Sequence, residues 1–162
     1  MQEVMKVNEV LEINYACRGY CKLPYPNHSK GCPNYNKNPE CPPKVKRIED
    51  VFDMNKDMFF IIEEFNLREH VEKMKIKHPY WSKLQLRNLL YWQGTVRKHL
   101  KEKVIYFIQH HDINMIYTLL PEAMGVMVIN TVLKLGIPIE RIPVNKVFKI
   151  ALVGYPIEKL NI

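Results

Sequence analysis

Three short apolar runs along the chain have the length and residue types of buried strands. They cover residues 58–65, 115–120 and 147–155, and each is rich in β-branched and aromatic side chains. In the segments between them, apolar residues recur at the wider spacing typical of helices. The pattern therefore predicts strands that alternate with helices.

Helical periodicity is clearest between the first two strands. Residues 67–77 form a short amphipathic stretch that Pro79 ends, and Ser82 is a suitable N-cap for a longer helix running toward Gln109. One apolar stripe along that helix is formed by Leu89, Gln93, Val96, Leu100, Val104 and Ile108. A further helix, apolar on most sides, is predicted to begin at Pro121 and to stop at Gly136.

This order of elements is typical of an α/β fold. We expect a small sheet in two or three layers, with crossover helices and at least one right-handed crossover. The length of 162 residues predicts a single domain over residues 1–162. Within it, residues 51–162 form the α/β scaffold, and residues 17–47 are an irregular metal-binding loop.

The segment 17–47 differs in composition from the rest of the chain. It contains all four cysteines and six of the eleven prolines, and it has no apolar periodicity. Proline and turn residues at this density exclude a regular helix or strand. A connection of about thirty residues is too long to be ordered without a core of its own. A bound metal is the candidate that would order it.

The cysteines themselves predict one soft-metal centre. Cys17, Cys21, Cys32 and Cys41 are separated by three, ten and eight residues. Four thiolates can form a tetrahedral zinc site or hold an iron–sulfur cluster of the 4Fe-4S type. Structural zinc sites usually have two close pairs of ligands, and only Cys17 and Cys21 form one here. The spacing therefore favours the cluster, with zinc as the alternative.

Basic residues surround the cysteines. Seven Lys and Arg side chains lie in this segment against the single acid Glu40. They either compensate the negative charge of four thiolates or hold an anionic, phosphate-bearing substrate beside the metal. The candidates for anion binding are Lys22, Lys30, Lys37, Lys44, Lys46 and Arg47.

Overall charge and hydropathy limit the class of protein. The formal charge is +7, which favours anionic partners. No apolar run reaches the roughly 18 residues that a membrane span needs, and the N-terminal residues lack the pattern of a secretory signal. We therefore expect a cytoplasmic protein without a membrane partner, in which reduced cysteines bind metal. Residues 67–103, which mix basic and aromatic side chains, make nucleic acid a possible partner.

The run CPNYNKNPECPP, followed by KVKRIEDVFD, resembles the signature of a family of predicted metal-binding proteins from archaea and anaerobic bacteria. The later stretch PEAMGVMVINTVLKLGIPIE resembles the C-terminal helix of that family. The resemblance covers residues 17–155 and implies metal or iron–sulfur binding without an assigned activity. Relatives of this kind carry a second cysteine group before that helix. The corresponding stretch here, QHHDINMIYTLLPEAMG, has none, which leaves one site.

Other candidate groups are weaker. His110, His111 and Asp112 are consecutive, so they point in different directions and fit a solvated helix end. Either Glu63 or Glu64 is a candidate to face a cleft at the end of its strand. Glu122 is a candidate general acid or base near the metal. A carboxylate at the end of a strand or at the start of a helix is also common without any such role. These candidates lie at the ends of the elements predicted above: Glu63, Glu64 and Glu122.

Two classes of function follow from these observations. As an enzyme or redox component, the protein would use the centre to transfer electrons to an unknown redox partner or to bind an anionic substrate. As a binding module, it would use zinc to order the loop and its basic surface to bind RNA or another anionic partner. The sequence lacks the motifs GxxxxGK[ST], GxGxxG and GxSxG, which gives no support to nucleotide hydrolysis, dinucleotide binding or α/β-hydrolase chemistry.

Overall fold

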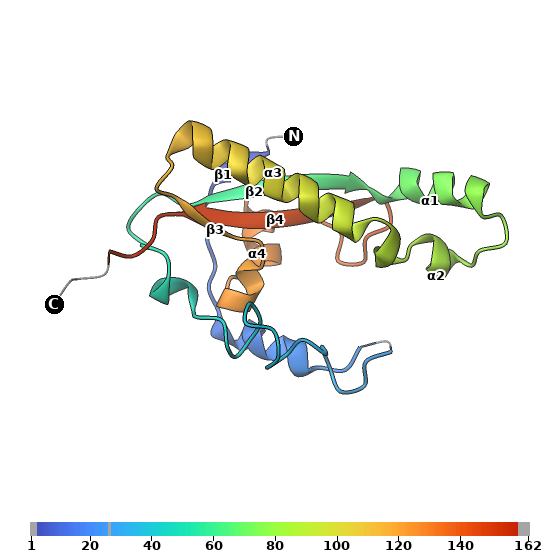
Figure 1. The fold of residues 1–162 in the computed structure, drawn as a ribbon, viewed down its shortest axis with the longest axis horizontal. Coiled ribbons are helices and arrows are strands. Elements are labelled where there is room, and N and C mark those ends of the chain that lie inside the picture. The colour runs from blue at the N-terminus through green and yellow to red at the C-terminus, as the bar shows by residue number, and fades with distance from the viewer. Residues whose placement is uncertain (1–2, 26, 159–162) are drawn as a thin grey trace.

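A computed structural model describes residues 3–25 and 27–158. Its centre is a four-stranded sheet in the order β1-β2-β4-β3 (Figure 1). Every neighbouring pair is antiparallel. The strands are β1 (Val4–Lys6), β2 (Phe59–Asn66), β3 (Ile116–Thr118) and β4 (Lys146–Gly154). The three predicted strands are confirmed as β2, β3 and β4, and the mixed α/β class is confirmed with them.

The connection from β2 to β3 crosses the sheet. Both strands run antiparallel to β4, which lies between them, so they are parallel to each other. The connection is helical and skips the position of β4. Its elements are α1 (Leu67–Lys77), α2 (Lys83–Leu86), the 3₁₀ turn η3 (Leu89–Tyr91) and α3 (Gln93–His111).

The two faces of the sheet pack against different layers. Alternate residues of β2 and β4 point to opposite faces, so Ile61 and Ala151 meet Leu100 of α3, whereas Phe60 and Leu152 face the other way. On that second face the core is completed by α4 (Val128–Lys134), by the 3₁₀ turn η2 (Ile48–Asp50) and by Phe52. Figure 1 shows α3 along one side of the sheet and α4 on the other. The fold therefore has three layers.

The long helix predicted from Ser82 is interrupted. Ser82 does form a capping box with Gln85, but the helix it begins is the single turn α2. The side chain of Asn88 then accepts a hydrogen bond from the Leu90 N–H and starts η3. Buried Trp92 stacks on Phe65 at 4.8 Å just before α3 begins, which fixes this turn against the sheet. The predicted stripe is buried at Val96, Leu100, Val104 and Ile108, whereas Leu89 is exposed.

The helix predicted from Pro121 is also divided. Pro121 occupies the first turn of the 3₁₀ helix η4 (Pro121–Met124), which ends at Gly125 with φ 105°. A side chain at Gly125 would place its Cβ 2.4 Å from the ring of Tyr15. Gly125 thus allows the segment before the cysteines to pack closely, and its carbonyl accepts a hydrogen bond from the Asn14 N–H. Gly136, with φ 76°, follows the end of α4 as the sequence predicted.

Two elements lie outside the sequence prediction. β1 is only three residues long and its sequence mixes apolar and charged side chains. The 3₁₀ helix η1 (Tyr15–Lys22) extends into the stretch for which no regular element was expected, so that expectation is wrong for residues 17–22. The first proline of the segment is Pro24, and the Asn14 side chain caps η1 by accepting from the Ala16 N–H, so a short helix is possible here.

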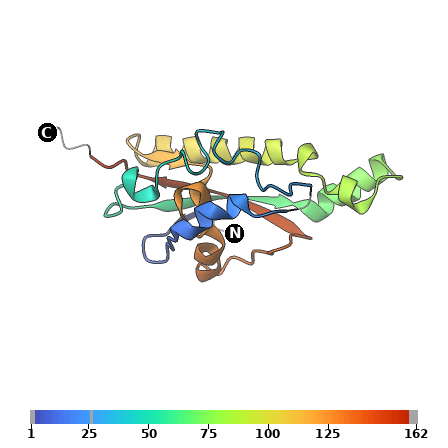
Figure 2. The same cartoon turned by 90° about the horizontal axis from the view of Figure 1, so that it is seen from below.

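The longest helix, α3, has nineteen residues and carries charged side chains along its length. Within the part of the chain that the structure describes, no helix combines the length and the apolar character needed to cross a membrane. Figure 2 shows η1 beneath the sheet and the following loop directed toward the side that carries α3. This loop holds the last two cysteines.

Candidate metal-binding segment

One backbone hydrogen bond brings Cys32 next to Cys21, and Cys17 lies four residues before Cys21 on the same 3₁₀ helix. Cys17 and Cys21 both lie on η1, and the Cys32 N–H donates to the Cys21 carbonyl over 2.7 Å. Gly31 makes this approach possible, because its φ is 81° and an added Cβ would lie 2.5 Å from the Cys21 carbonyl oxygen. Cys21 and Cys32 are therefore neighbours in space, although ten residues separate them.

A second set of turns returns the chain toward Cys32. The Tyr35 N–H donates to the Cys32 carbonyl over 3.1 Å, and the Asn36 N–H donates to the Pro42 carbonyl over 2.8 Å. Asn36 has a φ of 57°, a left-handed conformation that asparagine tolerates. These bonds fold residues 32–42 into a closed loop with Cys41 beside its start.

The thiols influence one another electrostatically. Burial raises the pKa of Cys21, and the charges of Cys32 and Cys41 raise it further. The pKa of Cys41 is raised by burial and then by Cys32. Cys17 has a pKa raised first by burial and then by Glu122 and, to a smaller extent, by Cys21. The shifts at Cys21 and Cys41 reflect their proximity to Cys32, and burial favours the protonated thiol at Cys17, Cys21 and Cys41.

The sulfurs do not form a completed coordination site. Across residues 3–25 and 27–158, no three His, Cys, Asp or Glu side chains lie close enough together to hold one ion. All four cysteines are free thiols, and the Cys17 Sγ donates to the Glu122 carbonyl over 3.4 Å. The donor chemistry fits a soft metal, but a shared centre requires the thiols to shift from these positions. Cys21, Cys32 and Cys41 are only half-buried, so their side chains have space to move.

Arg18 fastens the cysteine segment to the scaffold. Its Nε donates to the Ala123 carbonyl over 3.1 Å, and its Nη2 donates to the carbonyls of Pro43 and Val45. One guanidinium therefore joins η1, η4 and the end of the cysteine loop. In the sequence, Arg18 is one of the seven basic residues around the cysteines. In the structure, it donates hydrogen bonds to main-chain carbonyls.

The six predicted anion-binding side chains separate into two groups. Lys22, Lys30 and Lys37 line an open hollow of about 480 Å³ together with Cys21 and Cys32. The others are directed elsewhere: the Lys44 Nζ donates to the Lys37 carbonyl, Lys46 is exposed, and the Arg47 guanidinium lies over the Tyr15 ring at 4.5 Å.

The structure places Glu122 beside Cys17 and within electrostatic reach of Lys149. The carboxyl of Glu122 reaches solvent but is surrounded by protein, and burial raises its pKa. Burial and the nearby Arg97 lower the pKa of Lys149, whereas the charge of Glu122 raises it. The sequence named Glu122 but missed Lys149. The signal was present, because Lys149 is the only charged residue within the apolar run 147–155.

The weaker candidates have structural partners. Glu63 faces Lys149 across the strand pair, and its carboxylate lies 2.5 Å from the Lys103 Nζ. The Asp112 carboxylate accepts a hydrogen bond from the Tyr155 hydroxyl over 2.9 Å.

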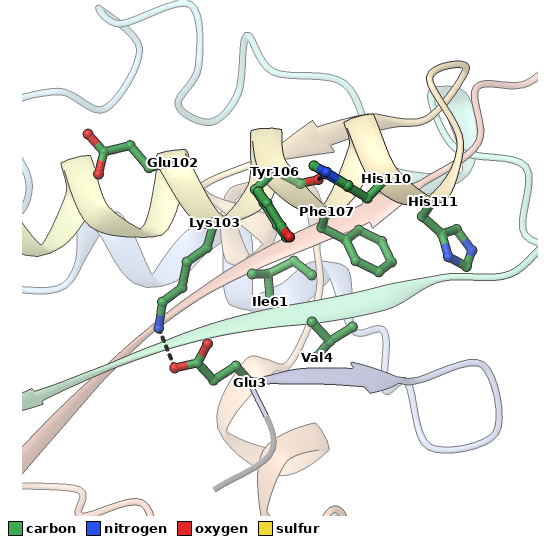
Figure 3. Close-up of a pocket in the computed structure, with 9 residues that line it drawn as sticks. All are labelled: Glu3, Val4, Ile61, Glu102, Lys103, Tyr106, Phe107, His110 and His111. Atoms are coloured by element: carbon green, nitrogen blue, oxygen red, sulfur yellow. Dashed lines mark hydrogen bonds and ion pairs between the residues drawn. The ribbon is translucent and has the colours of Figure 1, made fainter.

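A larger hollow, of about 650 Å³, lies between α3 and the edge formed by β1 and β2 (Figure 3). Tyr106, Phe107 and the two histidines His110 and His111 line it, and an ion pair between Lys103 and Glu3 at 2.7 Å borders it. The two histidines were expected to point in different directions, but both line this hollow, and His111 stacks on Phe107 at 4.8 Å. No cysteine lines this hollow, and η1 lies on the other side of the sheet, so the cysteine segment is a separate feature.

The whole chain was compared with known proteins. Searches against family models, curated proteins and solved structures found no match.

Proposed function

We propose that Cys17, Cys21, Cys32 and Cys41 bind one metal centre, an iron–sulfur cluster, and that the protein has a redox or cluster-dependent role. The observation that supports this most directly is the hydrogen bond from the Cys32 N–H to the Cys21 carbonyl, together with the turns that bring Cys41 back toward Cys32 within one folded segment. Thiols gathered in this way are the donor set that iron–sulfur clusters use.

The burial pattern of the segment supports the same proposal. Among the described residues between 17 and 47, only Cys17, Gly31 and Pro42 are buried. Apolar burial at this level gives little free energy to hold about thirty residues in one conformation. A metal centre would supply that free energy, because binding to the folded segment stabilises it.

Charge is also consistent with a metal. Four thiolates in one place repel each other, and a bound cationic centre would relieve that repulsion. Lys22, Lys30 and Lys37, which line the hollow beside Cys21 and Cys32, would offset the negative charge that remains. Their position also makes them the candidate ligands for an anionic substrate.

The choice between cluster and zinc rests on spacing. Only Cys17 and Cys21 form a close pair, and Pro33 and Pro42 follow the other two cysteines directly. A Cys-Pro step is also found where a cysteine run closes around an iron–sulfur cluster. When bound, such a cluster supplies one-electron chemistry; a zinc ion would instead make the segment a structural module.

The test is the metal and sulfide content of protein purified without oxygen. We expect a brown sample with iron and acid-labile sulfide, and loss of both in Cys32→Ser and Cys41→Ser. The matched control is Asn34→Ser, because Asn34 is an exposed residue of the same loop. It should keep the wild-type content.

Two results would change the proposal. A colourless sample with one zinc per chain, lost in the same cysteine variants, would establish the zinc module instead. Samples without metal, in which the variants and the control behave alike, would refute a centre of either kind.

A further inference from the structure

A long stretch of the chain contains no acidic residue. From Lys73 to Lys101 there is no Asp or Glu, while eight Lys and Arg residues and two histidines are present. The stretch covers the end of α1, all of α2 and η3, and the first half of α3. Figure 1 shows α1 and α2 projecting from one end of the sheet, away from the cysteine segment. Residues 67–87, which include both helices, carry six Lys and Arg side chains against Glu69 and Glu72, so the projection has a net positive charge.

The projection also presents flat aromatic rings. Trp81 stacks on His78 with ring centroids 3.9 Å apart and planes within 6°, and Tyr91 packs against it at 5.0 Å. Tyr80, next to Trp81, is 99% exposed. Trp92 differs, because it is buried against Phe65 and belongs to the core. The half-exposed Trp81 therefore lies on a rigid platform of stacked rings.

Charge and aromatic surface meet in one groove of about 620 Å³. Its lining includes Trp81 and four cations, and Glu72 is the one carboxylate among the residues that line it. That carboxylate lies 3.5 Å from Arg68, and the Arg87 guanidinium donates to the Pro143 carbonyl. Lys75 and Lys83 form no ion pair with any residue that the structure describes, so their charges are available to a ligand.

We propose that this groove binds single-stranded nucleic acid. Phosphates need cations along a groove, and unpaired bases need flat rings on which to stack. Within the groove, Lys75 and Lys83 supply the cations that pair with no described residue and Trp81 supplies the ring, and the exposed Tyr80 is its neighbour in the chain. The site is independent of the cysteine centre, since no cysteine lines the groove.

The shape of the groove is better suited to a single strand of nucleic acid than to a lipid surface. Exposed apolar side chains such as Ile76, Leu84 and Leu90 surround the projection, and a membrane with anionic headgroups would also attract its charge. A flat membrane cannot reach side chains that line a concave groove, whereas a single strand can. Replacement of Lys75, Lys83 or Trp81 should therefore weaken the binding of nucleic acid but not the binding of a membrane.

The experiment measures binding of labelled RNA and DNA oligonucleotides of about 12 nucleotides by fluorescence anisotropy, on the full-length protein at several salt concentrations. Lys75→Ala combined with Lys83→Ala should weaken binding at least tenfold and reduce the slope of log K against log salt by about 1.4. The matched control, Lys77→Ala with Lys98→Ala, removes the same charge outside the groove and should change binding by less than about threefold. Comparison of the RNA and DNA oligonucleotides identifies which of the two is preferred.

A second variant tests the aromatic platform. Trp81→Ala should weaken binding by about five- to 150-fold, whereas Trp81→Phe, which keeps a stacking ring, should lose far less. Equal losses in the groove and control lysine pairs would overturn the proposal. Binding to anionic vesicles without binding to either oligonucleotide would overturn it as well and assign the surface to a membrane.

Discussion

The sheet with its helices and the cysteine segment are held together by different forces. β2 buries three consecutive residues and β4 buries five, and α3 adds four buried residues to one face. The segment 17–47 buries only Cys17, Gly31 and Pro42 among its described residues. It is held by backbone turns and by the bonds of Arg18. The scaffold is ordered by its apolar core, and the segment is held by polar contacts.

This difference predicts how each region responds to mutation. Changes in the apolar core should lower the free energy of unfolding of the whole chain. Changes in the cysteine segment should open that segment while the sheet stays folded.

The largest effect is expected in the core between the sheet and α3. Leu100, which is 2% exposed, packs on Ile61, Ala151 and Val153. Leu100→Ala should reduce the free energy of unfolding by about 2–5 kcal/mol, because it leaves a cavity in a close-packed layer. Urea denaturation measures the loss. Leu84→Ala, at a position 85% exposed, is the control and should stay within about 0.5 kcal/mol of wild type.

Gly125 joins the two regions, so its replacement should have an intermediate effect. Gly125→Ala forces a side chain into a left-handed backbone and against the Tyr15 ring. The free energy of unfolding should fall by about 1–3 kcal/mol. Gly136→Ala is a matched control, because Gly136 also has a positive φ but has no atom within 4 Å of the added Cβ. A loss as large for Gly136→Ala would show that the Tyr15 contact contributes nothing.

Arg18 should affect the cysteine segment alone. Arg18→Ala removes the bonds to the Ala123 and Val45 carbonyls and should ease local opening by about 1.5 kcal/mol. Hydrogen exchange should quicken at residues 35–45 and stay unchanged in β2 and β4. Lys46→Ala removes an exposed charge of the same segment and should have no such effect. Faster exchange in the sheet would show that the two regions unfold together.

The smallest expected effect concerns pH. Hydrogen bonds from Lys134 and Asn130 to the Glu12 carboxylate lower its pKa in the folded state. The unfolded carboxyl has a pKa of about 4.3, so the stabilisation is fully present above that pH and is lost as pH falls through the lower folded pKa. Glu12→Gln should therefore reduce stability at neutral pH and flatten its decline below pH ~4.3. Thermal unfolding at several pH values measures this, and parallel curves for the two proteins would contradict it.

The sequence predicted the strands and α1 well because their signals are local. The run 67–77 begins after Asn66 and ends before Pro79, and α1 occupies the same residues. The break before α3 was missed because it depends on Trp92 stacking on Phe65, a contact between distant residues. β1 was missed because three residues carry too little pattern, and its position depends on pairing with β2.

The candidate site was only partly accessible to sequence analysis. Spacing identified the four cysteines and the cations, and the turns at Gly31 and Asn36 explain why the segment folds back on itself. The sequence could not distinguish Arg18 from the other cations, because its role is set by the carbonyls of Ala123 and Val45. Lys149 was missed because the groups that surround it are set by the pairing of β2 with β4, which the sequence alone does not give.

The lengths of the outer strands have a consequence for the behaviour of the protein at high concentration. β1 and β3 form the two edges of the sheet, and each has only three residues, while the longer β2 and β4 are enclosed between them. A short edge strand offers few unpaired main-chain N–H and C=O groups to a strand from another molecule. The architecture thus protects its most amyloid-prone sequences, the apolar runs of β2 and β4, from intermolecular pairing as long as the chain remains folded.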